Sequence, residues 1–316
     1  SIQPNWDGEF DYSHQVQSDR SPGDQGSDEK PAQQQAATSM AAIAAAMTGA
    51  AVIDQVGQPT PSRIAYASRL MSELPAEFSA AVNEPFAARA IIYYLLLDKD
   101  IKIHRKQLEQ LQSTADKGVY EETVKLLQAG YELKKEYRLP IVDMALATLH
   151  QLSANQYRLF RDNLNRLIEI DSKVSLFEWS IRKIIFHHLD PVFSGRPGTT
   201  AQKRSLMKTQ QECALLLSVL VHSAKQQGIS KEDVFRKACG QLSDVDLSML
   251  DTQDISLEKL DKALDTLAAL KPLEKPRLLK ACAVCITADR EISASEVEIY
   301  RAIAAILDCP VPPLVV

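Results

Sequence analysis

The chain has 316 residues, of which 45% are hydrophobic and 6% aromatic, enough to build the core of one or two domains. Its 36 Lys and Arg residues nearly balance its 41 Asp and Glu residues, which leaves a net charge of −5. Nothing in this balance indicates a general nucleic-acid-binding protein, because such proteins need a concentrated basic surface.

Residues 1–57 are predicted to be a linker followed by an alanine-rich arm. The first part, residues 1–35, is polar and rich in turn formers, so it has too little apolar surface to bury. The segment from Ala36 to Ile53 contains Thr, Ser and Gly, which makes it a poor membrane span and a better helix or arm. The chain opens with Ser1 and has no initiator Met or visible signal peptide, so we expect it to be part of a longer protein.

Residues 58–150 are predicted to form an N-terminal helical subdomain. Apolar residues recur at helical spacing throughout this range, and no segment has the alternation that is typical of a strand. Pro, Gly and capping residues divide the range. We expect helices to begin near Ser62, Pro75, Pro85, Asp100, Gly118 and Leu139.

Residues 151–316 are predicted to form a second helical domain. Ser153 should cap its first helix, and a helix after Ser175 should end at about Leu189, because Pro191 removes a backbone donor. A long helix is expected from about residue 199 to about residue 227. Later helices should begin near Ser230, Ser256, Pro272 and Ser293. The fold class is therefore predicted to be all-α, a bundle of about ten to twelve helices.

An acidic loop occurs twice in this second domain. Residues 171–178 and 289–296 both read D-x-x-[VI]-S-x-x-E. Ser175 and Ser293 are predicted helix N-caps, and Glu178 and Glu296 are placed to bond back to the cap N–H and complete a capping box. The apolar residues around the loops match at a constant offset, for example Leu164, Leu167 and Ile168 with Cys282, Cys285 and Ile286. We expect two helix–loop–helix hairpins that share one core.

Calcium binding is the alternative interpretation of these loops. The carboxylates of Asp171, Glu178, Asp289 and Glu296 could act as ligands, with Glu169 or Glu291 as a third in each loop. An EF-hand loop, however, has twelve positions, several oxygen ligands and a central Gly, and both loops here are shorter and lack Gly. A structural role in capping and loop closure is therefore the favoured prediction, with no metal or other cofactor bound by this chain.

The sequence contains no recognisable catalytic motif. HExxH and GxSxG are absent, and no glycine pattern for a phosphate or dinucleotide is present. His187 and His188 are adjacent, so on a helix they diverge by roughly 100° and are poorly placed to share one metal. The chain itself is therefore predicted not to be an enzyme.

The five cysteines favour a reducing compartment over a disulfide framework, because they are odd in number and most lie in apolar segments. Cys282 and Cys285 form a single CxxC pair. Both occupy positions that are Leu in the first copy of the repeat, so we expect them in the core.

A basic stretch follows the Gly-Pro segment at residues 195–198. It consists of Arg196, Lys203, Arg204 and Lys208. The favoured interpretation is the solvated start of a helix, and the alternative is a site for an anionic partner.

The range from about Leu152 to Leu307 resembles TerB-like domains, including the N-terminal module of DjlA-type membrane co-chaperones. That family carries an acidic loop of the form D-G-x-[IV]-S-x-x-E near the middle and near the end of a helical bundle. In this chain Ser172 and Arg290 replace the Gly of that pattern, which puts any metal role of the loops in doubt.

The wider chain resembles the region that follows the catalytic domain in long HtpX-type membrane zinc metallopeptidases. The resemblance covers nearly the full length and depends on the order of short motifs. These are Ile2-Gln-Pro-Asn-Trp-Asp-Gly8, Gly57-Gln-Pro-Thr-Pro61, Leu74-Pro75, Glu84-Pro-Phe86 through Leu95-Leu-Leu-Asp98, Arg138-Leu-Pro140, Leu176-Phe-Glu178 and Leu307-Asp-Cys-Pro-Val-Pro-Pro313.

This resemblance implies a parent protein that is a zinc endopeptidase of the inner membrane, with its HExxH helix upstream. The present chain would be a non-catalytic domain on the cytoplasmic face that recruits a substrate or protein partner, or restrains the protease. The resemblance implies no nucleic-acid partner, and membrane attachment only through the upstream spans. The alternatives are a TerB-like module that senses a cation or stress, and a purely structural oligomerisation module.

Overall fold

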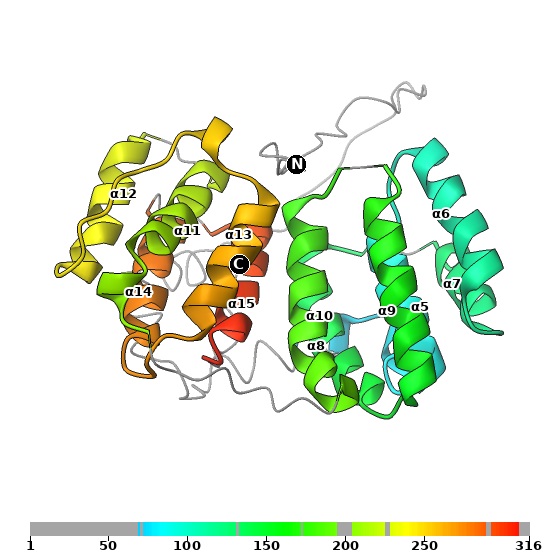
Figure 1. Ribbon diagram of the computed structural model, residues 1–316. Coiled ribbons are helices and arrows are strands. Elements are labelled where there is room, and N and C mark those ends of the chain that lie inside the picture. Colours follow the sequence, from blue (N-terminus) through cyan, green and yellow to red (C-terminus); the bar gives the residue numbers. More distant parts are fainter. Residues whose placement is uncertain are drawn as a thin grey trace, which may run out of the picture.

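The protein is all-α in the computed structural model, as predicted. The structure describes residues 69, 72–130, 133–171, 173–194, 204–224, 228–288 and 292–309. Within these ranges it contains twelve α-helices and no strand. Figure 1 shows the helices in two groups that lie side by side, α4–α10 and α11–α15.

The first group contains seven α-helices and a short 3-10 helix, η1, which spans Lys135–Tyr137. Several of its helices begin at a polar cap or at a proline, as the sequence predicts. Asp100 accepts two N–H groups at the start of α6, and Ser153 and Gln156 form a capping box at α9. The bounds are α4 Ala76–Ala81, α5 Pro85–Leu96, α6 Ile101–Thr114, α7 Val119–Gln128, α8 Arg138–Leu149, α9 Ala154–Glu169 and α10 Leu176–Ser194.

The second group contains five α-helices and three 3-10 helices. Ser230 caps α12 and Ser256 caps α13, each through a hydroxyl that accepts a backbone N–H of the first turn. The α-helices are α11 Gln210–Ser223, α12 Lys231–Cys239, α13 Leu257–Ala268, α14 Lys275–Ile286 and α15 Ala294–Ile306. The 3-10 helices are η2 Leu206–Lys208, η3 Gly240–Leu242 and η4 Thr252–Asp254.

Each group is built around one largely buried helix. α5 packs against α7, α8 and α9, and α11 packs against α12, α13 and α14. Both central helices are apolar on most sides, as expected of helices without a solvent face. The groups meet where α10 lies along α15, in the most extensive contact between any two of the described elements.

The repeat extends further towards the N-terminus than the acidic loops. Ala145, Leu146, Leu149 and Leu152 match Ala263, Leu264, Leu267 and Leu270 at the same offset as the loops, and all eight are buried. The unit α8–α9–α10 therefore corresponds to the unit α13–α14–α15. Its last helix in each copy, α10 or α15, packs against the other.

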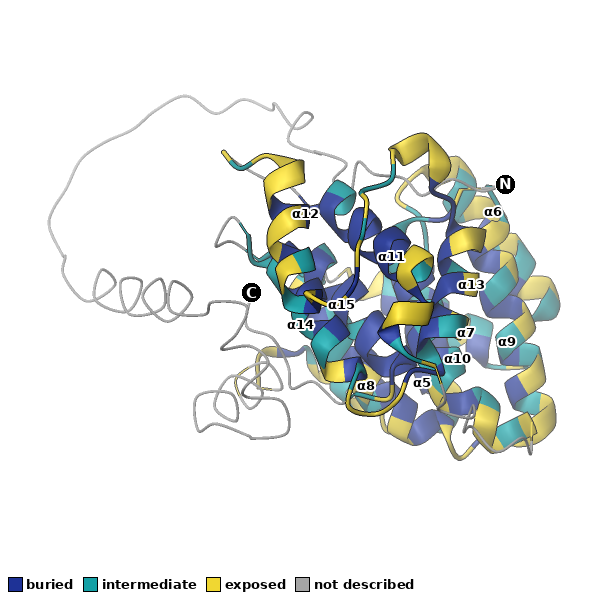
Figure 2. Ribbon diagram, turned by 60° about the vertical axis from the view of Figure 1, so that its left-hand side comes forward, coloured by how far each residue is buried: buried dark blue, intermediate teal, exposed yellow. Residues whose placement is uncertain are grey.

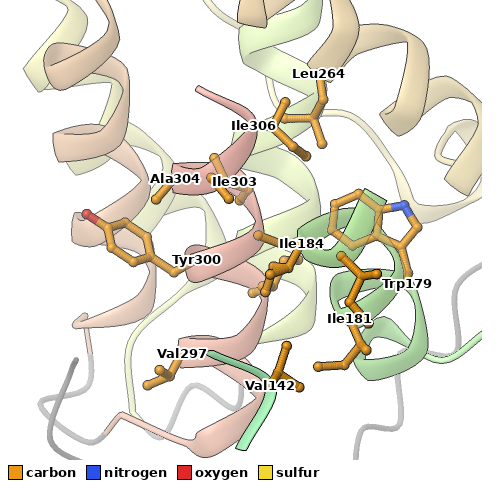
Figure 3. Close-up of a cluster of buried hydrophobic side chains, with 14 of the residues drawn as sticks. Val142, Trp179, Ile181, Ile184, Leu264, Val297, Tyr300, Ile303, Ala304 and Ile306 are labelled. Atoms are coloured by element: carbon orange, nitrogen blue, oxygen red, sulfur yellow. The ribbon is translucent and has the colours of Figure 1, made fainter. Parts of the chain in front are cut away.

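The contact between α10 and α15 is aliphatic and aromatic (Figure 3). It contains Ile181 and Ile184 from α10 and Ile303 from α15, each at most 2% exposed. Trp179 is fully buried beside α13, where its indole N–H donates to Asp261 at 2.7 Å. That bond satisfies the one polar atom of the side chain, so burial of the ring leaves no unpaired donor.

The buried residues of both groups form one continuous cluster. Figure 2 shows the buried positions gathered between the helices, with exposed positions on their outer sides. The cluster takes residues from both sides of the expected boundary between residues 150 and 151. The division into a subdomain at 58–150 and a TerB-like domain at 151–316 stays a prediction.

The expected end of the helix after Ser175 is wrong. α10 continues to Ser194 and contains Pro191. Proline removes one backbone hydrogen bond, but side chains on both sides of it hold the last turn. Asp190 accepts from Tyr157 and Arg161 of α9, and the ring of Phe193 stacks on that of Tyr157 at 4.4 Å.

The expected start of the long helix near residue 199 is also wrong for the described residues. α11 begins only at Gln210, and the segment before it is extended and then turns through η2. The backbone of Arg204 bonds instead to Ala269 and Lys271, and the N–H of Leu206 donates to Glu274. These tertiary bonds use the backbone groups that a longer helix would need.

Several predicted features lie outside the described residues. They are the linker and arm at residues 1–57, the helix start at Ser62, the Gly-Pro segment with Arg196 and Lys203, and the loop residues Ser172, Asp289, Arg290 and Glu291. Among the described helices, none combines the length and apolar character that crossing a bilayer requires.

The contact between α10 and α15 should dominate the stability of the fold. We expect Ile303→Ala to lower the free energy of unfolding by about 2–5 kcal/mol, because it leaves a cavity in a fully buried contact. Urea unfolding followed by circular dichroism measures the change. Ile101→Ala is the matched control, since Ile101 is 77% exposed, and a loss as large as that of Ile303→Ala would contradict this assignment.

Candidate functional site

Both repeated loops end in a capping box. The backbone N–H and hydroxyl of Ser175 donate to Glu178 Oε2 at 2.8 and 2.7 Å, and the Glu178 N–H donates to Ser175 Oγ at 3.2 Å. Ser293 and Glu296 repeat the arrangement at 2.7, 2.8 and 3.3 Å. The two boxes therefore fix the starts of α10 and α15, the two helices that join the groups.

The acidic side chains of the first loop accept hydrogen bonds from residues of the same loop. Asp171 accepts the N–H of Lys173 at 2.9 Å, and Glu178 is held by Ser175. Among the described residues, no group of three or more His, Cys, Asp or Glu side chains is arranged to hold a metal ion. Asp289 lies outside the described residues, so the second loop cannot be compared at that position.

Glu178 is an unusual carboxyl group for a helix cap. Burial raises its pKa to about 7, against the lowering effect of its bonds to Ser175, and the nearby charges of Asp171 and Asp98 raise it further. Asp98 belongs to the segment between α5 and α6, so the first acidic loop lies beside that segment. Gln107 of α6 ties the two regions together, because its amide donates to the carbonyls of Leu96 and Leu167.

A more deeply buried carboxylate lies where α8, α10 and α15 meet. Glu298 of α15 is 2% exposed, and its Oε1 has no hydrogen-bond partner. Arg138 at the start of α8 lies 3.8 Å from it, an ion-pair distance too long for a hydrogen bond. The guanidinium of Arg138 also sits 4.3 Å above the ring of Phe177 of α10. Burial raises the pKa of Glu298 to about 7, and the charges of Arg138 and Lys135 lower it only in part.

Ion pairs continue along the same junction. Arg301 of α15 pairs with Asp143 of α8 at 3.1 Å. Past the end of α15, Asp308 accepts a hydrogen bond from His187 of α10 at 3.0 Å and pairs with Lys275 of α14 at 3.4 Å. Lys275 is only 3% exposed, so its pairing with Asp308 offsets part of the cost of burying its charge. Asp308 has a φ of 51°, a left-handed conformation that its short polar side chain tolerates.

An aromatic surface lies on the side of α9 and α10, and we name it the α9–α10 face: Tyr157, Arg161, Phe186, Asp190 and Phe193. Arg161 lies 4.6 Å from the ring centroid of Phe186, and Phe193 stacks on Tyr157. Arg161 and Tyr157 both donate to Asp190, at 3.0 and 2.6 Å. Phe186 and Phe193 remain half-buried, so solvent reaches two aromatic rings whose positions are already fixed.

The cysteines belong to the core. Cys213, Cys282 and Cys285 are at most 1% exposed, and all three are free thiols. Burial raises the pKa of each far above the range in which thiolates form. Buried, neutral thiols are poor nucleophiles, and those of Cys282 and Cys285 fit the apolar positions that the repeat assigns to them.

Comparisons with known proteins identify no relative. No protein-family model, no curated protein and no solved structure matches the chain.

The buried carboxyl of Glu298 gives the fold a testable pH dependence. Its pKa is about 7 in the fold and about 4.5 when exposed, so the folded state binds a proton that the unfolded state has lost between these values. Stability should therefore fall as pH rises from about 4.5 to about 7, by up to about 3 kcal/mol from this group.

Chemical unfolding of the Glu298→Gln variant at several pH values tests this. The neutral amide should raise stability at pH 8 and flatten the slope between pH 5 and pH 7. Glu178 titrates in the same window, so part of the slope should remain. A slope unchanged by the substitution would assign the pH dependence to other groups.

The cap of α15 can be tested separately. Ser293→Ala removes the hydroxyl that accepts the Glu296 N–H, and we expect a loss of about 1 kcal/mol in thermal or urea unfolding. Ser293→Gly should cost only a few tenths of a kcal/mol, because glycine leaves the cap position accessible to water. A Ser293→Ala loss as small as that expected for Ser293→Gly would show that the hydroxyl is not the stabilising group.

Proposed function

We propose that the chain is a non-catalytic helical interaction domain. The observation that carries the proposal is the α9–α10 face. Aromatic and arginine side chains dominate the binding energy of protein interfaces, and they are most effective when they are held in place before binding. Phe186 and Phe193 meet both conditions, because Arg161 and Tyr157 fix them while leaving them partly accessible.

The geometry around Asp190 explains how this face stays ordered. Asp190 accepts from both Arg161 and Tyr157, so one carboxylate orients the cation and the phenol that contact the two half-buried rings. Burial, with help from the bond to Asp190, raises the pKa of Tyr157 far above neutrality. The phenol therefore stays protonated, and it remains a donor to Asp190 at every physiological pH.

The proposed context is a membrane-anchored zinc metallopeptidase. The support is the order of the motifs that resemble the region after the catalytic domain of HtpX-type enzymes. In that context the domain recruits a substrate or partner protein, or restrains the protease, on the cytoplasmic face of the inner membrane. Zinc and the HExxH helix would belong to the protease domain.

A cation-sensing TerB-like module is the alternative to this proposal, and one observation bears on it. The carboxylates of Asp98 and Asp171 lie close enough to Glu178 to raise its pKa. The Ser175 bonds already engage Glu178, so we expect no saturable calcium binding at micromolar concentrations in isothermal titration calorimetry. Binding that Asp171→Ala abolishes would instead support the sensing role.

The proposal that this chain has no peptidase activity of its own is tested by a direct assay. The chain incubated with zinc and a casein substrate should release no peptides above background. Turnover that a chelator suppresses would contradict a non-catalytic domain. The reading frame upstream of Ser1 should contain HExxH and apolar spans, and their absence would remove the metallopeptidase context.

The α9–α10 face can be tested against the polypeptide encoded upstream. We expect the chain to co-purify with it, and Phe186→Ala with Phe193→Ala to weaken binding roughly tenfold or more, as loss of aromatic anchors does. Phe86→Ala is the matched control, a phenylalanine 40% exposed on α5. Melting curves check that each variant is folded. Binding unaffected by the double substitution would place the interface elsewhere.

A further inference from the structure

A second surface lies in the other group of helices, and we name it the basic–apolar surface: Arg204, Met207, Lys208, Lys271 and Leu273. Two chain segments build it. Arg204 donates to the carbonyl of Ala269 at 3.0 Å and accepts the N–H of Lys271 at 3.0 Å. The segment that leads into α11 therefore lies beside the turn that follows the C-terminal end of α13 and precedes α14.

One further bond holds the two segments together beside their apolar residues. The N–H of Leu206 donates to the carboxylate of Glu274 at 2.7 Å. Met207 directly follows Leu206, and Leu273 directly precedes Glu274, so both lie next to the ends of one hydrogen bond. The residues on the inner side, Leu206 and Leu270, are at most 1% exposed. They anchor both segments in the core.

The outer apolar residues are left in water. Leu273 is 88% exposed and Met207 is 63% exposed. Leu273 has the largest exposure among the large apolar side chains that the described residues present to solvent. Its turn is closed by the Glu274 N–H, which donates to the carbonyl of Lys271 at 2.9 Å. The side chain of Leu273 is therefore exposed although its turn is closed by a hydrogen bond and anchored to the core.

The charges around these two side chains are mainly positive. Arg204, Lys208 and Lys271 are all exposed, while the chain as a whole has a net charge of −5. Glu274 uses its carboxylate on the Leu206 N–H, and Glu212 in the first turn of α11 is half-buried. The outward side of the surface is therefore cationic, with two apolar tips.

We propose that the basic–apolar surface binds the headgroup region of an anionic phospholipid bilayer. Exposed cations are attracted to anionic lipids, and apolar side chains beside them can enter the boundary between headgroups and acyl chains. Two apolar side chains offer far less than the roughly 800 Å² that each partner buries in a stable protein interface. A bilayer needs no matching pocket, so the small size of the surface favours it over a protein partner.

Vesicle co-sedimentation of the full chain tests this proposal. The probes are vesicles of phosphatidylcholine alone and vesicles of an equal mixture of phosphatidylcholine and phosphatidylglycerol. We expect binding only to the mixed vesicles, weakened by added salt because the attraction is screened. Lys208→Gln with Lys271→Gln should reduce the partition coefficient roughly tenfold or more. Met207→Gln with Leu273→Gln should also reduce it.

Matched controls come from the first group of helices. Ile101→Gln removes an equally exposed apolar side chain, and Lys102→Gln with Lys106→Gln removes two exposed cations of α6. These variants should bind as the unchanged chain does. No binding to mixed vesicles, or equal losses in the controls, would overturn the proposal. All substituted residues are exposed, so we expect each variant to fold. Circular dichroism checks this.

Discussion

The packing of α10 against α15 is the contact on which the rest of the structure depends. Each group of helices has its own buried central helix, and the two groups meet most extensively along this pair. The contact is formed by aliphatic side chains such as Ile184 and Ile303. These two helices are also the capped helices of the repeat. Two Ser-x-x-Glu capping boxes therefore set where the helices that join the two groups begin.

The polar groups of this junction limit how α8, α10 and α15 can be arranged. Arg138 contacts Phe177 of α10 and lies 3.8 Å from Glu298 of α15. Glu298 is buried without a hydrogen bond on one oxygen, so its charge is costly and its protonation is linked to folding. Ion pairs of this kind add little to net stability. Their effect is to favour one relative position of the three helices.

Local signals in the sequence were sufficient for the caps and for most helix starts. Ser153, Ser175, Ser256 and Ser293 lie at helix starts because a hydroxyl acts on residues two or three positions away. The tertiary bonds of Arg204 and Glu274 replace the expected first turns of the long helix. No motif near Arg204 in the sequence predicts them, because their partners lie far along the chain. The same holds for Pro191, which side chains from α9 keep within a helix. The wider repeat, with Leu149 matching Leu267, is also present in the sequence, but only the spacing of apolar residues carries it, without a capping motif to mark it.

The two proposed surfaces differ in how firmly their apolar side chains are held in place. This difference favours a different kind of partner for each surface. In the α9–α10 face, one ring is stacked on Tyr157 and the other is covered by Arg161, so a partner would meet aromatic anchors that are already fixed. In the basic–apolar surface, only the backbone is fixed, and Leu273 projects with almost no neighbours. A projecting side chain without a surrounding contact area has no shape for a protein to match, whereas a fluid bilayer can close around it. Because the two proposed surfaces lie in different groups of helices, the two proposals are compatible: a protein partner on the first would leave the second accessible to lipid.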